Sequence, residues 1–400
     1  MEHSHLRDLF RRHIAPTSPW SMALEVDRAE GSYIYDYRGK GYLDFISGIS
    51  VSIVGHRHPV VHRAVTEQLD RYWHTMVYGE HVQHPQVRLA TLLHEFLGPT
   101  LDQVYFANSG AEAIEGAMKL VKKVTGRPRL VSFRNAYHGG TQGALSILGS
   151  EMYRSPYRPL LPETYLLDYN DESGLDFLDE RVAGVFVEAV QAEAGALPAN
   201  PGWLKVLESR CRQLGIALVF DEIQTGLGRC GTWFGFQHDG ILPDVVVMAK
   251  GLGGGLPIGA FAASSSMMQQ LAEDPPLGHL TTFGGNPVCA AAAVAVVEVI
   301  RDQGLAARAM KAHDILAGRV KEWSLETGLP IQLSGRGLLL GLELEQDPLK
   351  AREWISRCWQ AGLLVDWFLF NEGRLRLAPP LNISEGELHD AMDILRKAHG

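Results

Sequence analysis

The sequence predicts an α/β protein with a large domain built on a mainly parallel sheet and a smaller α+β domain. The chain has 400 residues, and single hydrophobic cores rarely grow beyond about 250 to 300 residues. In the middle of the chain, short apolar segments alternate with segments of helical periodicity, as strands covered by helices on both faces do. No repeat, low-complexity segment or Gly/Ser linker separates the parts, so we expect interleaved domains.

The first half of the chain predicts a hairpin, a helical region and then strands. Residues 31–45 alternate apolar and polar side chains around a glycine-bearing turn, which is typical of a β-hairpin. From about Pro59 to Gly98 the apolar residues recur at helical spacing. The strands expected for the large domain are Gln103–Ala107, Arg129–Phe133, Val182–Glu188, Ala217–Phe220, Val245–Met248 and Ile258–Ala263.

The last third of the chain predicts the smaller domain. An Ala/Val-rich helix is expected over Cys289–Arg301. Strands are expected near Leu338–Glu345 and Arg374–Ala378.

Composition favours an enzyme-like protein that acts on small molecules. The net charge of −9 disfavours a nucleic-acid partner, because a phosphate backbone requires a basic face. The four cysteines form no CxxC pair or Cys/His cluster, so no metal site is expected and a reducing compartment is favoured. No apolar run is long enough to span a bilayer, and residues 1–13 lack the apolar core of a secretory signal. We therefore expect a cytoplasmic protein without membrane partners.

The first chemically informative segment is Phe106–Lys119, where a strand passes through a small polar turn into a helix. Ser109 and Glu112 have the spacing of a capping box, so the helix should begin there with free N–H groups. Gly110 and Ala111 leave room for an anion at this terminus, which suits a phosphate. The capping box alone also fits an ordinary helix start.

The second segment is Asn135–Gly140, directly after a predicted strand. It places Tyr137 and His138 at a strand's carboxyl end, where ligand crevices of α/β proteins open. Tyr137 could stack on a planar ring. Packing for Tyr137 and a hydrogen-bonded scaffold role for His138 are the alternatives.

The third segment ends an apolar strand with two carboxylates, Asp221 and Glu222, and breaks into a glycine-containing loop. A carboxylate at the end of a buried strand is costly unless it is paired, which makes Asp221 a functional candidate. Opposite a pyridine nitrogen, such a carboxylate would keep the nitrogen protonated and let the ring accept electrons. Helix capping remains an alternative for Glu222.

The fourth segment, Pro243–Gly259, is a strand that delivers Lys250 into a glycine-rich loop. A crevice that lowers the pKa of a lysine is what Schiff-base chemistry requires. A nucleotide-binding loop is excluded because the lysine precedes the glycines and GxxxxGK[ST] is absent.

These four segments, together with Thr281-Thr-Phe-Gly-Gly-Asn-Pro287, resemble the class III aminotransferases in order and spacing. The similarity runs from about Ser18 into the C-terminal region and is nearest to the acetylornithine, ornithine and 4-aminobutyrate group. The resemblance implies fold type I, with a seven-stranded-type sheet and a small domain formed by both termini. The implied boundaries are 1–50 and 288–400 for the small domain and 51–287 for the large one.

The resemblance also implies a pyridoxal 5′-phosphate (PLP) site. Lys250 would form the Schiff base and carry the proton, and Asp221 would pair with the ring nitrogen. The implied cofactor-binding residues are Ser109, Gly110, Ala111, Tyr137, His138, Glu188, Asp221, Gln224, Lys250 and Thr282. In the family, the threonine matched by Thr282 reaches the cofactor of the neighbouring subunit, which implies a homodimer with shared active sites.

The same comparison implies an amino-group transfer from an amino acid, ω-amino acid or amine to an oxo acid such as 2-oxoglutarate, through pyridoxamine phosphate. Arg376 matches the arginine that binds the oxo acid's carboxylate, and Glu193 matches its alternative partner. Gly140 stands where relatives carry a further arginine, which favours another ω-amino acid, a β-amino acid or an amine as donor. His56, His58 and residues 78–81 fall in regions that line the substrate entrance in relatives.

Two other functions would keep part of this site. A PLP-dependent aminomutase or racemase would retain Lys250, Asp221 and the phosphate-binding turn, but it would recycle one substrate. Arg376 with Glu193 favours two alternating substrates instead. A non-enzymatic cofactor-binding protein would not need both Lys250 and Asp221.

Overall fold

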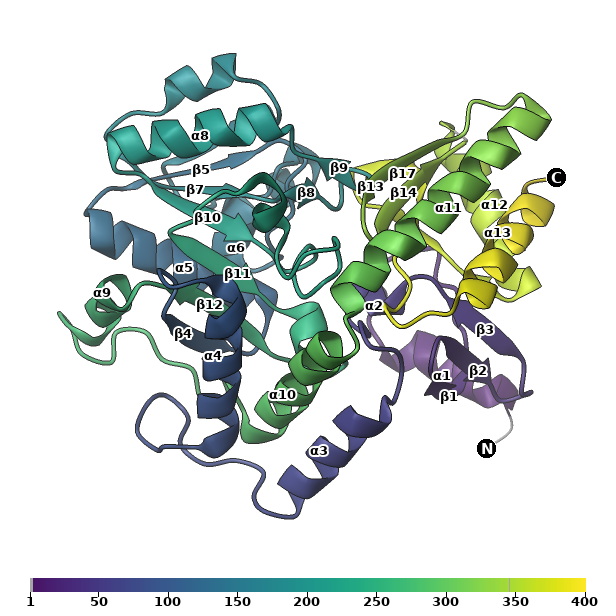
Figure 1. Ribbon diagram of the computed structural model, residues 1–400, viewed down its shortest axis with the longest axis horizontal. Helices are drawn as coiled ribbons and strands as arrows, with labels where there is room; N and C mark the ends of the chain where they lie inside the picture. Colours follow the sequence, from purple (N-terminus) through teal and green to yellow (C-terminus); the bar gives the residue numbers. More distant parts are fainter. Residues whose placement is uncertain (1–2, 345) are drawn as a thin grey trace.

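The computed structural model describes residues 3–344 and 346–400. Figure 1 shows a sheet layered with helices on one side of the molecule and a smaller group of helices and strands on the other, where both chain ends lie. Two predictions touch residues outside this description: the start of the N-terminal segment, at Met1 and Glu2, and the end of one strand, at Glu345.

The large part of the molecule is built on one seven-stranded sheet. Only β12 runs antiparallel to its neighbours, pairing with β11 on one side and β4 on the other. The sheet is therefore mainly parallel, as predicted. Its strands, in spatial order, are β4 (Gln103–Ala107), β12 (Gly259–Ala263), β11 (Val245–Met248), β10 (Ala217–Asp221), β7 (Val182–Val187), β5 (Arg129–Phe133) and β6 (Thr164–Leu167).

Alternate side chains of these strands enter two separate hydrophobic cores. In β10, Leu218 and Phe220 belong to one core and Ala217 and Val219 to the other. Helix α8 (Pro201–Leu214) packs into the first core and α5 (Gly110–Thr125) into the second. Because both faces are covered, the central strands are mostly apolar, which is why they were visible in the sequence.

The remaining helices of the large part are mostly short. Helix α10 packs against α3 and α4, and Asn286 caps its first turn by accepting hydrogen bonds from Val288 and Cys289. These elements are α2 (Ser47–Ser50), α3 (Pro59–Leu69), α4 (His84–Leu97), α6 (Gln142–Ser146), α7 (Glu151–Arg154), α9 (Ser265–Met268) and α10 (Pro287–Asp302). The one-turn 3₁₀ helices are η1 (Ser155–Tyr157), η2 (Ser173–Phe177), η3 (Gly235–Asp239), η4 (Lys250–Gly253) and η5 (Gln269–Ala272).

The smaller part combines both ends of the chain. Strand β15 pairs in parallel with β3, which joins the C-terminal segment to the N-terminal hairpin. One sheet is β1 (Val26–Glu30), β2 (Tyr33–Asp36), β3 (Gly41–Asp44) and β15 (Leu363–Leu364); the other is β13 (Gln332–Arg336), β14 (Leu339–Glu343), β17 (Asn371–Leu377) and β16 (Asp366–Phe368). Its helices are α1 (His3–His13), α11 (Leu305–Thr327), α12 (Pro348–Ala361) and α13 (Glu385–His399). The predicted fold class is confirmed.

Several local predictions differ from the structure. The helical region predicted from Pro59 to Gly98 is two helices, α3 and α4, separated by non-helical residues 70–83. The edge strand β6 was not predicted, because its four residues are all half-buried and lack the continuous apolar pattern. The ribbon of β8 (Val190–Gln191) and β9 (Leu197–Pro198) is too short for a periodic signal.

Within the described ranges, no helix combines the length and the apolar character needed to cross a membrane. The four cysteines are free thiols, and three of them are buried.

Candidate active site

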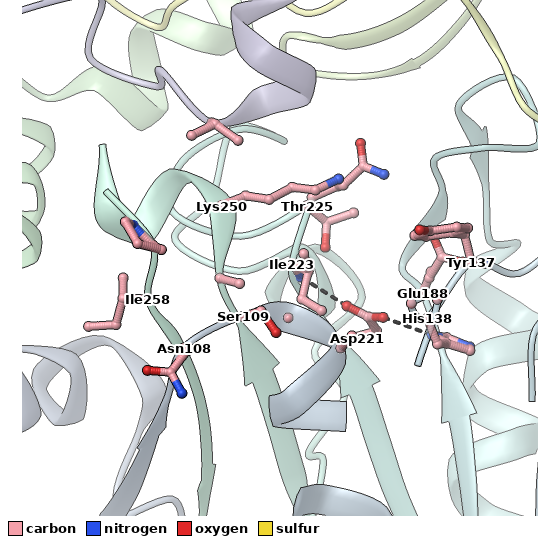
Figure 2. A pocket seen from close by; sticks show the side chains of 18 of the residues that line it. Asn108, Ser109, Tyr137, His138, Glu188, Asp221, Ile223, Thr225, Lys250 and Ile258 are labelled. Carbon is pink, nitrogen blue, oxygen red and sulfur yellow. Dashed lines mark hydrogen bonds and ion pairs between the residues drawn. The ribbon is translucent and has the colours of Figure 1, made fainter. Parts of the chain in front are cut away.

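The predicted site residues meet at the carboxyl ends of the sheet strands. A cavity of about 430 Å³ opens there, and Figure 2 shows Lys250 extended across it, with Asp221 and His138 joined by a hydrogen bond. It is lined by Val51, Asn108, Ser109, Gly110, Ala111, Tyr137, His138, Gly139, Gly140, Glu188, Asp221, Ile223, Gln224, Thr225, Ala249, Lys250, Gly255, Leu256, Pro257 and Ile258. All of the predicted cofactor-binding residues except Thr282 are in this lining.

Helix α5 begins at the cavity wall. The Ser109 hydroxyl accepts a hydrogen bond from the Glu112 N–H at 3.2 Å, as predicted for a helix cap. The reciprocal half of the predicted capping box is wrong, because the Glu112 carboxylate accepts from the backbone and side-chain nitrogens of Asn108 instead, at 2.7 Å each. The first turn of the helix therefore points its unpaired N–H groups at the cavity, an arrangement that binds anions.

Two glycines let neighbouring segments approach this helix start. A Cβ on Gly259 would lie 2.1 Å from the Ser109 carbonyl oxygen, and one on Gly139 would lie 2.6 Å from Ala111 Cβ. Strand β12 and the loop after β5 can reach the turn only because these residues lack side chains. These two contacts hold the start of α5 against the cavity wall.

Asp221 ends β10 in a buried hydrogen-bond network. Its Oδ2 lies 2.7 Å from His138 Nδ1, and its Oδ1 accepts from the Ile223 N–H at 3.0 Å. The other nitrogen of His138 lies 3.0 Å from Ser132 Oγ. Burial lowers the pKa of His138, but the hydrogen bond and charge of Asp221 outweigh burial, so that the pKa is raised overall. The Asp221 carboxylate thus favours the protonated form of His138.

Lys250 follows β11 and begins η4. Its φ of 47° lies in the left-handed region, which is unusual for a residue with a side chain. The pKa of Lys250 is lowered to about 8 overall: burial is the main cause, Glu193 opposes it and the Arg376 guanidinium adds to it. A larger fraction of the amine is therefore unprotonated near neutral pH than for an ordinary lysine, as a nucleophilic lysine requires.

Tyr137 and Glu188 form another part of the wall. The Tyr137 N–H donates to Glu188 Oε1, and the Ala192 N–H donates to Glu188 Oε2, each at 3.0 Å. Burial raises the pKa of Glu188 to about 8, although His138 opposes the shift. The carboxylate fixes the loop that carries Tyr137, whose ring can cover a planar ligand.

The predicted substrate-binding pair, Arg376 and Glu193, is joined to the cavity wall through Gln224. Arg376 Nη2 is 2.8 Å from Glu193 Oε2, and Gln224 Nε2 donates to Glu193 Oε1 at 3.1 Å. The Gln224 side-chain oxygen is buried and has no hydrogen-bond partner in the described chain. It is available to a ligand hydroxyl in the cavity.

Four other sequence candidates lie away from these contacts. Thr282 is exposed and is not part of the cavity lining of its own chain. His56 pairs with Asp44 at 2.8 Å, and His58 caps α3 by accepting from the Val60 N–H. Gly140 lines the cavity with open space around it, and it contributes no cation.

Sequence reasoning missed several residues that line the cavity. Asn108 anchors Glu112 and also donates to Thr281 Oγ1 at 2.9 Å. Val51, Ile223, Thr225 and Ile258 complete the wall. Asn108 precedes the predicted cap by one residue and Ile223 follows Asp221 by two, so position next to a motif was the available signal. Among residues 3–344 and 346–400, no group of His, Cys, Asp and Glu side chains could hold a metal ion.

Comparison with known proteins agrees with this geometry. The aminotransferase class-III family matches residues 15–399. The acetylornithine aminotransferase of Archaeoglobus fulgidus is 38% identical over 387 residues, covering 96% of this chain and 98% of that protein. The acetylornithine aminotransferase of Bacillus subtilis is 35% identical over 377 residues, covering 94% of each.

Solved structures share the fold over nearly the whole chain. An aminotransferase from Bacillus anthracis superposes with a TM-score of 0.93 at 27% identity, covering 99% of this chain and 98% of that one. The ornithine aminotransferase of Toxoplasma gondii, crystallised with partial PLP occupancy at its active site, has a TM-score of 0.90 at 29% identity, with coverages of 99% and 94%.

Proposed function

The chain belongs to the class-III aminotransferase family, and from this premise we propose that PLP is held in the cavity beside Lys250. The enzyme is a transaminase that moves an amino group from a donor to an oxo acid. The family implies PLP as its cofactor. The observation that carries the residue assignment is the convergence of Lys250, Asp221 and the start of α5 on one cavity.

The cavity fits the cofactor's parts separately. The unpaired N–H groups of Gly110 and Ala111 would bind the phosphate, and Asp221 would face the pyridine nitrogen. Tyr137 would cover the ring, and Gln224 would hydrogen-bond its hydroxyl. When bound, PLP supplies an aldehyde that captures amines and a ring that withdraws electrons.

Lys250 does two things in this proposal. Its Nζ holds the cofactor between turnovers, and once displaced by the donor amine it removes and returns a proton as general base and acid. Its lowered pKa, about 8, suits both roles near neutral pH. Asp221, hydrogen-bonded to His138, would face the ring nitrogen and favour its protonated form.

Arg376 and Glu193 would let one pocket accept two substrates in turn. Glu193 neutralises the guanidinium while a donor without a carboxylate at this position is bound. An oxo acid such as 2-oxoglutarate would then replace Glu193 with a two-pronged carboxylate contact. An aminomutase or racemase is not favoured, because the relatives described above are aminotransferases.

The donor class follows from the charge of the cavity wall. Lys250 is the only lysine or arginine among the cavity-lining residues, and Gly140 leaves its part of the wall uncharged. The matched relatives are named for acetylornithine, so that compound belongs at the head of the donor panel. We expect donors whose reacting amine is terminal, including ω-amino acids and simple amines, to be accepted.

The assembly we propose is a homodimer with shared active sites. Thr282 is exposed beside Phe283, which is 56% exposed, and the Phe283 ring packs tilted against His74 with ring centroids 5.0 Å apart. Trp73 is nearby in the chain and is 69% exposed. Large apolar side chains on a surface are typical of a protein interface.

An absorbance titration tests this function. The PLP-loaded protein is mixed with each amine of the donor panel, and then with 2-oxoglutarate. We expect the visible band of the lysine-bound cofactor to disappear with a true donor and to return with the oxo acid. Lys250→Ala is the control, because it retains the binding cavity but has no amine to form the band. A donor that is converted without any requirement for an oxo acid would contradict the proposal and indicate a mutase or racemase.

A further inference from the structure

Arg376 is held by two carboxylates, and only one of them belongs to the pair described above. Asp366 in β16 lies directly opposite Arg376 in β17 in the antiparallel register, so their side chains share one face of the sheet. Asp366 Oδ1 is 3.4 Å from Arg376 Nε. This places Asp366 on one edge of the guanidinium and Glu193 on another.

The guanidinium uses its three nitrogens differently. Nη2 donates to Glu193 at 2.8 Å and to the Trp367 carbonyl at 3.2 Å. Nε lies beside Asp366 as an ion pair without a hydrogen bond, and neither Nε nor Nη1 has a hydrogen-bond partner among the described residues. The Phe368 ring lies below the group, with its centroid 4.8 Å from Cζ. If Glu193 moved away, Nη1 and Nη2 would together present an open fork of the kind that binds a carboxylate in two places.

The two carboxylates also differ in how they are held. Glu193 accepts from Gln224, from the Leu369 N–H and from Arg376, at 2.8 to 3.1 Å. Asp366 Oδ1, in contrast, has no hydrogen bond within the described chain, and its ion pair with Arg376 is its one recorded contact with a cation. Glu193 can therefore leave Arg376 and still be held by Gln224 and the Leu369 N–H. Asp366 Oδ1 has no such hydrogen bond in the described chain and faces Arg376 alone among recorded cations.

The charge state of Asp366 agrees with a lasting ion pair. The pKa of Asp366 is raised to about 6 overall: burial is the main cause, Arg376 opposes it, Glu193 and Asp44 add to the rise, and Lys250 lowers it. The group is mostly ionised at neutral pH. Its side chain is 20% exposed.

From this geometry we infer that Asp366 is a positioning residue, which fixes Arg376 through Nε while Glu193 and the carboxylate of the oxo acid exchange places on Nη1 and Nη2. The inference rests on the proposed role of Arg376 in oxo-acid binding. A buried guanidinium that loses Glu193 would otherwise be left without a charged partner, which is unfavourable in a site 2% exposed. The planar guanidinium of Arg376 must also keep its orientation, because small displacements of a substrate-binding group strongly lower the reaction rate.

The test separates the two half-reactions of the PLP-loaded enzyme. Single-turnover absorbance measures the donor half-reaction with an amine that has no carboxylate, and then the return reaction over a range of 2-oxoglutarate concentrations. For Asp366→Ala we expect the apparent Kd for 2-oxoglutarate to rise about tenfold or more, while the limiting rate and the donor half-reaction change less than about threefold. Asp366→Asn keeps the shape of the side chain beside Nε but removes its charge, so it should raise Kd if the ion pair is what fixes Arg376.

A neighbouring pair supplies the control. Glu343 pairs with Arg374, two residues from Arg376 on the same strand, and Glu343→Gln should change neither half-reaction. Unchanged oxo-acid Kd in both Asp366 variants would overturn the inference, and so would an equal loss in both half-reactions, which indicates a general structural role. Failure of the wild-type donor half-reaction with every amine would contradict the proposed function itself.

Discussion

Lys250 shows how the fold prepares one side chain for chemistry. Strand β11 ends at Met248, and the chain enters η4 with a left-handed residue that directs the lysine into the cavity. Such a conformation costs roughly 1–3 kcal/mol and persists only where the surroundings enforce it. The glycines that follow allow the tight turn. The local sequence and the strained conformation of Lys250 therefore both place its amine in the cavity.

The lowered pKa of Lys250 can be measured without turnover. We expect its reactivity toward acetic anhydride in the cofactor-free protein to rise with pH and to level off above about 8, because only the free amine reacts and its fraction grows as pH passes the pKa. Competitive labelling followed by mass spectrometry of the Lys250 peptide gives the profile. A midpoint at the ordinary lysine value of 10.5 would show that burial does not act as argued.

Substitutions of the neighbouring carboxylates Asp221 and Glu222 should have different effects, the first on kcat and the second on the free energy of unfolding. Asp221→Asn removes the charge opposite the ring nitrogen, and we expect kcat to fall by about 100-fold or more, the scale of losing one preorganised electrostatic contact. Glu222 instead accepts hydrogen bonds from Gly235 and Phe236 at 2.8 Å each.

Glu222→Gln is therefore the matched control. It should lower the free energy of unfolding by about 1–3 kcal/mol and leave kcat within a few-fold. Steady-state kinetics and thermal unfolding of both variants check the contrast. Equal kinetic losses in the two variants would contradict the separate roles.

At the level of elements, the buried strands were predictable and the irregular connections were not. Strands β5 and β11 match their predicted limits because they are buried and mostly apolar, and the edge strand β4 matches as well. The residues between α3 and α4 carry similar apolar spacing but are not helical. That difference depends on tertiary contacts, such as the hydrogen bond from Asn286 to the Trp73 carbonyl, which local periodicity cannot show.

The candidate site residues divide in the same way, into those that the local sequence predicts and those that depend on tertiary contacts. Residues that carry a distinctive chemistry at a strand end, such as Asp221 and Lys250, were recognised because each interrupts an apolar pattern. Asp366 was missed because β16 is three residues long and its pairing with Arg376 depends on the sheet register. The partner of Glu112 was also misassigned, since Asn108 competes with Ser109 for the same carboxylate.

A substitution at Gly259 tests whether the close approach of β12 to the start of α5 shapes the proposed anion site there. In Gly259→Ala the new methyl group would meet the Ser109 carbonyl and push the helix start away from the cavity. We expect PLP affinity to fall about tenfold and the unfolding free energy to drop by about 1–3 kcal/mol. Fluorescence titration with PLP and chemical unfolding measure the two effects.

Gly318→Ala provides the comparison for that experiment. Gly318 is in helix α11 and has open space around the position of a Cβ. Alanine there should stabilise the protein by about 0.5–1 kcal/mol without changing PLP affinity. Unchanged PLP affinity in Gly259→Ala would show that the backbone relaxes and that the predicted crowding has no consequence for the site.

Over the whole molecule, the two ends of the chain are joined to each other and to the active site. The Ala378 N–H donates to the Phe45 carbonyl at 2.7 Å, and the Leu381 N–H donates to the Ile53 carbonyl at 2.8 Å. These bonds connect the segment that follows Arg376 to the residues on both sides of the cavity-lining Val51. Arg376, which we propose binds the oxo acid, is thus joined through the backbone to a segment that lines the cavity.

The proposed homodimer with shared active sites makes a prediction that a single subunit could not satisfy. Lys250→Ala and Thr282→Asp should each inactivate the pure protein, the first by removing the amine and the second by placing a charge against the partner's phosphate. If Thr282 serves the partner, a mixed dimer contains one doubly defective site and one intact site. Co-expression in equal amounts should then restore about a quarter of wild-type activity, since half of the dimers are mixed.

The same mixture distinguishes the opposite arrangement. If Thr282 served the cavity of its own chain, every site in every dimer would carry one defect, and no activity would return. The exposure of Thr282 and its absence from the lining of its own cavity favour the first outcome. The two variants can be tagged differently, so that only the mixed dimers, which carry both tags, are purified and assayed. Their activity should approach one half of wild type per dimer, because one of the two sites is intact.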